Sequence, residues 1–181
     1  MLAYRSWSMN PDYSTDPYDY EYYDMAECRL MSLSRPMAHE WRSHSNWAKC
    51  IPHAQEEHMY VSCTQSPNKG CKQEFGCGFY SYKDYEAAYR ATDTAKTFPP
   101  RCLGIIWAWG TVIEHEDDII RSEIVDIWHL IGIPYMYPNA PAYKNDFLEI
   151  AYKMKLPYFI SQSKAETLSQ FETLSVKLME K

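Results

Sequence analysis

The chain has 181 residues, of which 46% are hydrophobic and 23% are charged, as in an ordinary globular domain with one hydrophobic core. Its net charge of -6 at pH 7 argues against a general nucleic-acid-binding protein. The longest apolar run, residues 103–113, is too short to span a bilayer, and the first residues lack the cationic and apolar regions of a signal peptide. We therefore expect a cytoplasmic protein with no membrane-spanning segment.

A strand predicted over residues 2–8 leads into an acidic segment. Residues 11–27 contain six acids and no Lys or Arg, and the rest of the chain has 18 acids and 18 bases. Five tyrosines are interspersed with these acids, and two prolines interrupt the segment, as is typical of a loop. The segment is either a solvated loop or the contact surface for a basic protein partner, with carboxylates that steer the approach and rings that supply contact area. The residues that we predict to contact the partner are Asp16, Asp19, Tyr20, Glu21 and Tyr22.

Short elements are predicted in the next part of the chain. Residues 29–34 are predicted as a short strand, and residues 79–82 have the aromatic character of another. Residues 84–95 follow the second of these strands with a helical pattern, and Pro99 and Pro100 end it.

A long antiparallel hairpin forms the predicted centre of the fold. Residues 103–113 and 119–128 are β-branched and aromatic, and the charged residues 114–118 between them form the turn. Strand alternation predicts one pair of side chains on each face, Trp107 with Trp109 and Ile106 with Ala108. We expect the inward-facing tryptophan to be a large buried residue of the core.

Two helices are predicted near the end of the chain. Residues 142–155 have a helical apolar stripe, and residues 156–160 form a short strand or extended link. Ser163 and Glu166 have the spacing of a capping box, which opens a last helix. The side chains predicted to be buried in this helix are Leu168, Phe171, Leu174 and Leu178.

These elements predict a single α+β domain over residues 1–181. Its antiparallel sheet is built around the long central hairpin, with a metal-binding insert over about residues 50–77 and a helical part over about residues 142–181. The sequence has neither internal repeats nor a second domain.

Cysteine and histidine cluster in residues 50–77, which contain four of the six cysteines and two of the six histidines. Zinc prefers four tetrahedral ligands from these two residue types, and a filled set leaves no open position for catalysis. We predict a structural zinc ion held by Cys50, His58, Cys63 and Cys77, with Cys71 as the alternate for Cys63 and His53 as the alternate for His58.

The alternative interpretation treats these cysteines as small buried hydrophobic residues and the histidines as solvated. The residues between them are mostly polar and offer little to a core, so another interaction must order the segment. A metal ion bound by about 10 kcal/mol or more would do so. Clustered cysteines in a reducing compartment are also more often metal ligands than disulfides.

Several short motifs resemble a set of small uncharacterised bacterial and phage proteins. The resemblance covers residues 3 to about 128 and carries no activity over to this chain. The motifs, in order, are YRSW from Tyr4, CGFY from Cys77, WGTVIEHE from Trp109 and RSE from Arg121.

A looser resemblance is to ADP-ribosyltransferases. Arg5, Tyr80 followed by a helix containing alanine and tyrosine, and Glu123 stand in the order of the residues that grip NAD in that family. The resemblance implies a carboxylate that stabilises the charge developing as nicotinamide leaves. The alternative, which we favour, is a core tyrosine and two surface charges.

The sequence thus favours a zinc-stabilised binding or regulatory protein rather than an enzyme. The resemblance to phage proteins implies an accessory protein of a phage or mobile element that contacts a host factor through its acidic, tyrosine-rich surface. An NAD-dependent transferase using Arg5, Tyr80 and Glu123 is the alternative. A third interpretation, nucleic-acid binding, is opposed by the charge balance, although a local basic patch is available in Arg42, Lys49, Lys69 and Lys72.

Overall fold

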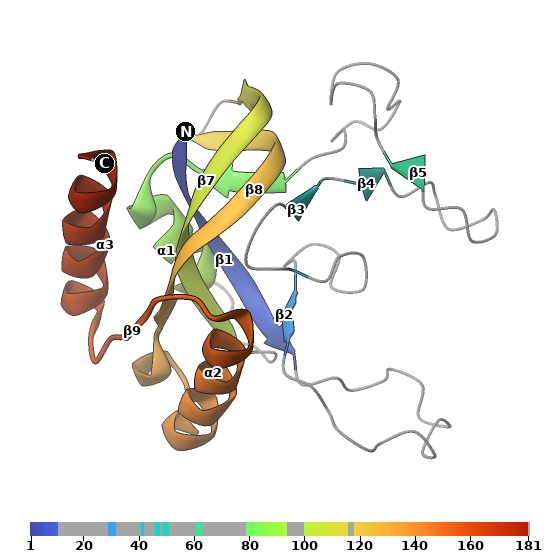
Figure 1. Ribbon diagram of the computed structural model, residues 1–181. Coiled ribbons are helices and arrows are strands. Elements are labelled where there is room, and N and C mark those ends of the chain that lie inside the picture. The colour runs from blue at the N-terminus through green and yellow to red at the C-terminus, as the bar shows by residue number, and fades with distance from the viewer. Residues whose placement is uncertain are drawn as a thin grey trace, which may run out of the picture.

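A computed structural model shows a mixed α+β fold (Figure 1). The structure describes residues 1–10, 29–31, 41, 46–47, 49–50, 61–62, 79–93, 100–115 and 118–180. The α+β class and the antiparallel character of the main sheet, both predicted from the sequence, are confirmed.

The central hairpin consists of β7 (Arg101–Glu114) and β8 (Ile119–Gly132), which pair antiparallel over most of their length. Both strands are longer than predicted from the sequence. Two irregularities interrupt the ladder, one between Ile105 and Ile106 and one between Trp109 and Val112. Such bulges bend a strand and increase its twist, which allows the long hairpin to curl.

β1 (Leu2–Asn10) lies antiparallel to β7, from Leu2 opposite Trp107 to Ser8 opposite Arg101. On its other edge β1 pairs with β2 (Arg29–Met31). The strands predicted at both places are therefore confirmed, although β2 is shorter than predicted.

Three further strands line up along the outer edge of β8. They are β6 (Phe79–Tyr82), β3 (Asn46–Trp47) and β9 (Tyr158–Ile160), and only β9 is parallel to β8. β6 also pairs with β1, where Tyr82 lies opposite Tyr4. Since β1, β7, β8 and β6 each pair with the next, the sheet closes on itself at this end. Within the described residues the main sheet has seven strands.

The two faces of β7 follow the predicted alternation, but the tryptophans point outward. Ile106 and Ala108 are fully buried, whereas Trp109 is 38% exposed and Trp107 is partly buried. The expectation of an inward-facing tryptophan in this strand was therefore wrong. The inner face is the one that Trp7 of β1 shares with Ile106, and Trp107 stacks on the opposite face against Trp128, with ring centroids 5.3 Å apart.

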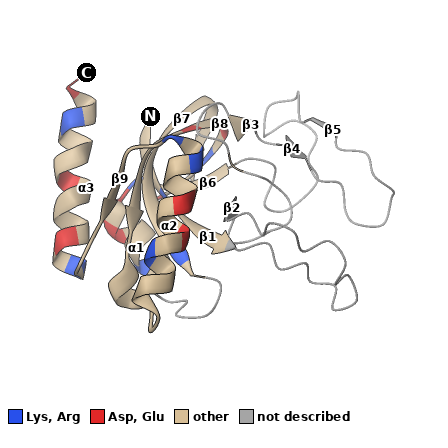
Figure 2. Ribbon diagram, turned by 60° about the horizontal axis from the view of Figure 1, so that its bottom comes forward, with Lys and Arg blue, Asp and Glu red and all other residues tan. Residues whose placement is uncertain are grey.

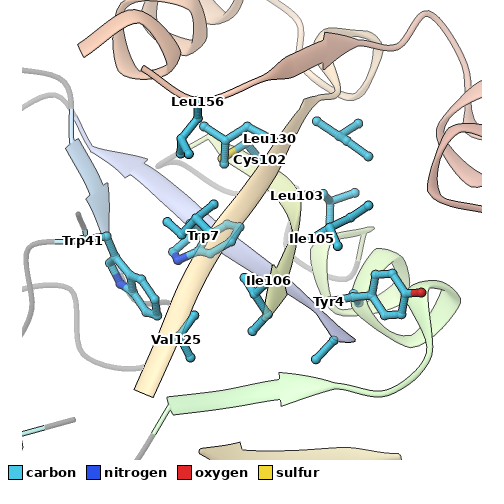
Figure 3. Close-up of a cluster of buried hydrophobic side chains, with 14 of the residues drawn as sticks. Tyr4, Trp7, Trp41, Cys102, Leu103, Ile105, Ile106, Val125, Leu130 and Leu156 are labelled. Carbon is cyan, nitrogen blue, oxygen red and sulfur yellow. The ribbon is translucent and has the colours of Figure 1, made fainter. Parts of the chain in front are cut away.

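Trp7 of β1 lies at the centre of the core (Figure 3). Its ring meets that of Trp41 edge-on at 5.5 Å, and Trp41 in turn lies 4.7 Å from Phe79 of β6. Gly104 of β7 provides the space for Trp7, because a Cβ atom at this position would lie 2.7 Å from the Trp7 ring and 2.5 Å from the carbonyl oxygen of His129. The close approach of the two strands thus requires glycine.

The three helices begin where the sequence places capping residues. α1 (Tyr85–Asp93) starts after Asp84, whose carboxylate accepts hydrogen bonds from the next backbone N–H groups. α2 (Ala140–Met154) is capped by Asn139 and preceded by the short 3-10 helix η2 (Pro134–Met136).

α3 (Lys164–Met179) begins at the predicted N-cap, Ser163, whose hydroxyl accepts from the Glu166 N–H at 3.2 Å. The second bond of the predicted capping box is displaced by one residue, because the Glu166 carboxylate accepts from the Gln162 N–H instead of the Ser163 N–H. Only one of the four side chains predicted to be buried, Phe171, is fully buried; the three leucines are partly buried at the edges of the core.

Hydroxyl groups fill the positions of α3 that the leucines were expected to fill. Thr167 and Ser175 are buried and flank Phe171 by one turn on either side. Ser175 Oγ lies 2.7 Å from the Tyr4 hydroxyl, and Thr167 Oγ1 lies 2.9 Å from the Tyr135 hydroxyl. The surface on which α3 packs is itself rich in hydroxyl groups. We call it the tyrosine layer, and it comprises Tyr4, Tyr85, Tyr89 and Tyr135.

The described helices include none that is both long enough and apolar enough to cross a membrane.

The burial pattern of β7 predicts unequal effects of truncating its side chains. Ile106→Ala should lower the free energy of unfolding by about 2–5 kcal/mol, because the residue is fully buried and would leave a cavity. Trp109→Ala should cost less than half of that, although it removes more atoms, because its ring is partly solvated. Urea unfolding of both variants measures the difference. An equal or larger loss at Trp109 would contradict the orientation of the strand.

Candidate functional site

The motifs that carried the family resemblance meet at one end of the sheet. Arg5 lies in β1, and its Nη1 donates a hydrogen bond to the backbone carbonyl of Tyr80 in β6. Tyr80 lies opposite Arg121 of β8, and its ring stacks on that of His115, with centroids 6.1 Å apart. Four segments that are distant in sequence therefore contact one another here, where the sheet closes.

Arg5 is a buried residue, not the surface charge that we expected. Its side chain is 6% exposed, and its guanidinium lies over the Trp41 ring at 4.6 Å from the centroid. Burial lowers the pKa of Arg5 to about 10. The guanidinium remains charged at neutral pH, so its contacts with the Tyr80 carbonyl and the Trp41 ring help to hold β6 and Trp41 against β1.

Glu123 occupies the bulge in the distal half of β7. Its Oε2 accepts a hydrogen bond from the Thr111 N–H at 3.1 Å. Gly110 has a φ of +72°, and a Cβ atom there would lie 2.8 Å from the same carboxylate oxygen. The two residues Gly110 and Thr111 thus face Glu123 alone, which is the arrangement of a β-bulge stabilised by a side chain.

The exposed rim of this region is formed by the end of the hairpin. Glu114 is exposed and makes an ion pair with Lys83 at 2.6 Å. The neighbouring His115 is also exposed, and its backbone N–H donates to the Ile119 carbonyl, which closes the turn. Asp118 adopts a left-handed conformation with φ of 59°, as polar turn residues do.

The three residues of the transferase hypothesis therefore have structural contacts. Arg5 and Tyr80 are brought together, but through the Tyr80 backbone rather than its ring, and the Arg5 side chain is buried. Glu123 is held by the backbone of the opposite strand. NAD binding would require these groups to face an accessible cleft, and the hypothesis that they form a catalytic set stays a prediction.

The predicted zinc ligands lie mostly outside the described residues. Among the residues that the structure describes, no group of three metal-ligating side chains occurs. The predicted ligands that lie outside the described residues are His58, Cys63 and Cys77, together with the alternates His53 and Cys71. Cys50 is described through its backbone, as the last residue of β4 (Lys49–Cys50).

The pairing of β4 nevertheless bears on this site. β4 is antiparallel to β5 (Val61–Ser62), with Cys50 opposite Val61. Cys63 follows β5 directly in the sequence, and His53 and His58 belong to the connection between the two strands. In the sequence, two histidines thus lie between Cys50 and Cys63. A sixth cysteine, Cys102, is fully buried in the core, and burial raises the pKa of its thiol.

The predicted partner-binding residues also lie outside the described part of the chain, but the strands on either side of them are described. Asn10 at the end of β1 lies opposite Arg29 at the start of β2. Residues 11–28 are therefore the connection of an antiparallel hairpin, with its two ends side by side.

An aromatic patch on the outer face of β7 and β8 was not predicted. It consists of Trp107, Trp109 and Trp128, and the Trp109 indole N–H donates to the Asp126 carboxylate at 3.1 Å. Trp128 is the extra residue of the first bulge, since Ile106 pairs with Ile127 and Ile105 with His129. Trp107 pairs with Asp126, and Trp128 lies two residues further along β8, so strand alternation places Trp128 on the same outer face as Trp107.

Charges on the three helices are of both signs (Figure 2). Arg90 of α1 lies near Asp84 and Glu86, and Lys153 of α2 pairs with Glu149 at 2.9 Å. Exposed pairs of this kind contribute little to stability and mark a solvated surface.

Comparison of the chain with protein-family models, with curated proteins and with solved structures found no match.

The bulge at Gly110 predicts a specific sensitivity to substitution. Gly110→Ala should lower the free energy of unfolding by about 1–3 kcal/mol, because alanine is strained at this positive φ and its Cβ would meet the Glu123 carboxylate. Thermal or urea unfolding measures the loss. Combining Gly110→Ala with Glu123→Ala should relieve the clash but not the strain. A neutral Gly110→Ala would contradict the left-handed geometry.

Proposed function

We propose that this protein acts by binding a protein partner through the acidic connection between β1 and β2. The observation that carries the proposal is the pairing of Asn10 with Arg29. Because these two residues lie opposite each other, β1 and β2 do not need residues 11–28 to span the distance between them.

The composition of this connection supports a basic partner. It holds the whole net charge of the chain and five tyrosines. Carboxylates raise the rate of association with a basic surface, and tyrosine rings supply contact area at a low entropic cost once the partner is docked. Both ends are fixed by β1 and β2, which reduces the conformational entropy that binding must remove.

A structural zinc ion forms the second part of the proposal. Cys50, His58, Cys63 and Cys77 supply two types of donor that suit tetrahedral zinc, and the β4–β5 ladder supports this choice by placing Cys50 opposite Val61, two residues before Cys63. Zinc would order the polar segment beside the sheet and perform no chemistry, because four protein ligands fill its coordination.

The cellular setting of the proposal follows from the family resemblance. A phage or mobile-element accessory protein that meets a host factor in the cytoplasm fits a small acidic domain that acts by contact. Cysteines kept reduced in that compartment would be available to a metal.

Metal analysis tests the zinc proposal. Protein purified without added metal should contain about one zinc per chain, and a chelator should remove it with a loss of stability. Cys77→Ser should abolish the zinc content. Cys102→Ala is the matched control: it should destabilise the core, in which Cys102 is buried, yet retain zinc. Native protein free of zinc would refute the proposal.

Replacement of the acidic connection tests the binding proposal. Residues 11–28 exchanged for an Asn-Gly turn should leave the thermal unfolding of the sheet nearly unchanged, because the ends of β1 and β2 already lie side by side. A partner captured by the native chain should no longer bind. If that partner binds the shortened chain equally well, the contact surface lies elsewhere.

Point variants separate the two roles of the connection. Neutralising Asp16, Asp19 and Glu21 should slow association and flatten its dependence on salt, because steering is electrostatic. Tyr20→Ala and Tyr22→Ala should instead speed dissociation, because they remove docked contact area. Surface plasmon resonance at two salt concentrations distinguishes these outcomes, and equal effects of both sets on dissociation would contradict the division.

A further inference from the structure

β9 is an outer strand of the main sheet, and one of its edges is open among the described strands. It runs parallel to β8, from Tyr158 opposite Leu130 to Ile160 opposite Gly132, and pairs with no other described strand. Both ribbon views show β9 between α2 and α3 (Figure 1, Figure 2). The edge of β9 that faces away from β8 is therefore available for a further strand.

The hydrogen bonds to β8 show which backbone groups the outer edge offers. The carbonyl of Pro157 accepts from a backbone N–H of β8, and the N–H of Ser161 donates to a backbone carbonyl of β8. Successive residues of a strand direct their N–H and C=O groups to opposite edges. Phe159 therefore faces β8 as well, whereas Tyr158 and Ile160 present their N–H and C=O groups to the outer edge.

Two exposed tyrosines, Tyr152 of α2 and Tyr158 of β9, form a pair beside this edge. They are 65% and 36% exposed, their hydroxyl oxygens lie 3.1 Å apart, and their rings meet edge-on with centroids 5.7 Å apart. Phe147 of α2 supports the Tyr158 ring from the core, edge-on at 6.1 Å. The tyrosine pair thus offers aromatic contact area whose conformation is already restricted, which lowers the entropic cost of binding.

The charge around β9 is positive, in contrast to the net charge of -6 of the chain. Residues 150–171 contain three lysines and a single acid, Glu166, whose carboxylate takes part in the cap of α3. Lys153 pairs with Glu149. The other two lysines, Lys155 before β9 and Lys164 after it, are exposed. An extended segment beside β9 would therefore meet positive charge toward both of its ends.

We propose that the outer edge of β9 binds an extended, acidic segment of a protein partner. The segment would add to the sheet as a further strand, held by main-chain hydrogen bonds to Tyr158 and Ile160. The tyrosine pair would cover one of its side chains, and Lys155 and Lys164 would attract its carboxylates. Because two residues supply few main-chain bonds, the rings and the lysines would provide most of the selectivity.

The same lysines argue against a second copy of this chain at the edge. Antiparallel pairing of two β9 strands would set Tyr158 of each copy opposite Ile160 of the other. The start of one strand, which Lys155 precedes, would then lie beside the end of the other, which Lys164 follows. Like charges would approach each other at both ends, which opposes such pairing. An acidic segment meets the same lysines with favourable charge.

This site differs from the acidic connection proposed above in position and in sign. That connection joins β1 to β2, whereas β9 pairs with β8. The connection suits a basic partner and the β9 edge suits an acidic one. Either proposal can therefore fail without the other.

Hydrogen exchange of the native chain tests whether the edge is open. The Tyr158 and Ile160 amides, which point away from β8, should exchange about tenfold or more faster than the Ser161 amide, which donates to the Gly132 carbonyl. The three amides belong to one short segment, so Ser161 is an internal reference. Equal protection of all three would mean that the outer edge is already paired, and would overturn the proposal.

A free peptide tests the chemistry of the occupant. A peptide of alternating glutamate and valine, added to the native chain at saturating concentration, should slow exchange at the Tyr158 and Ile160 amides by about tenfold, because both N–H groups gain acceptors. A lysine–valine peptide of equal length is the matched control and should leave both amides unchanged.

Variants of the flanking side chains test how the segment is recognised. Tyr152→Ala should weaken binding of the glutamate–valine peptide by about fivefold or more, because it removes an exposed ring, while its thermal unfolding stays close to that of the native chain. Tyr152→Phe keeps the ring and should bind almost normally. Lys155→Asn combined with Lys164→Gln should weaken binding and flatten its dependence on salt. Asparagine suits position 155, because Lys155 has a left-handed φ of 52°.

Each outcome decides one part of the proposal. Absence of protection by the acidic peptide overturns the edge as a binding site. Equal protection by the acidic and basic peptides overturns the acidic partner, and a concentration-dependent dimer of the native chain that protects Tyr158 and Ile160 assigns the edge to a second copy. Unchanged binding in Tyr152→Ala excludes the tyrosine pair from the site. Protection by the acidic peptide alone, weakened in the lysine variant, supports the proposal.

Discussion

The close approach of Trp7 to Gly104 is the constraint on which the rest of the structure depends. The indole ring lies where a Cβ atom of Gly104 would be, so β1 can rest against the centre of the β7–β8 hairpin. β1 in turn is the strand that β6, Trp41 and α3 contact. Its inner face carries Arg5, which contacts β6 and Trp41, and its outer face carries Tyr4, which contacts α3. The closure of the sheet between Tyr4 and Tyr82 follows from this placement.

The fold was predictable from sequence where the local pattern and the tertiary environment agree. The β-branched run of the hairpin, the Ser163–Glu166 capping box and the helices met this condition. The bulges did not, because they depend on contacts between distant residues: the ladder shifts at Trp128, and the left-handed Gly110 lies where Glu123 accepts from the Thr111 N–H. The tryptophans of β7 were misplaced for another reason, since the size of a side chain does not tell which face of a strand is buried.

α3 shows how a helical pattern can predict an element yet miss its packing. Apolar periodicity favoured the leucines for the buried stripe, but the surface that receives α3 is the tyrosine layer, whose hydroxyl groups need partners. Thr167 and Ser175 provide them on either side of Phe171. The candidate sites divide similarly. Cysteines, histidines and acidic tyrosine-rich segments are visible as composition, whereas the contact of Arg5 with the Tyr80 carbonyl depends on how distant strands pair.

β1 also fixes the place of the proposed binding connection. It spans nine residues and pairs with β7 over most of them, and its last residue, Asn10, lies opposite Arg29 of β2. The residues on both sides of the connection 11–28 are therefore held by the same sheet that encloses Trp7. If this connection binds a partner, as we propose, its two ends are already fixed, and the entropy lost on binding is limited to the connection itself.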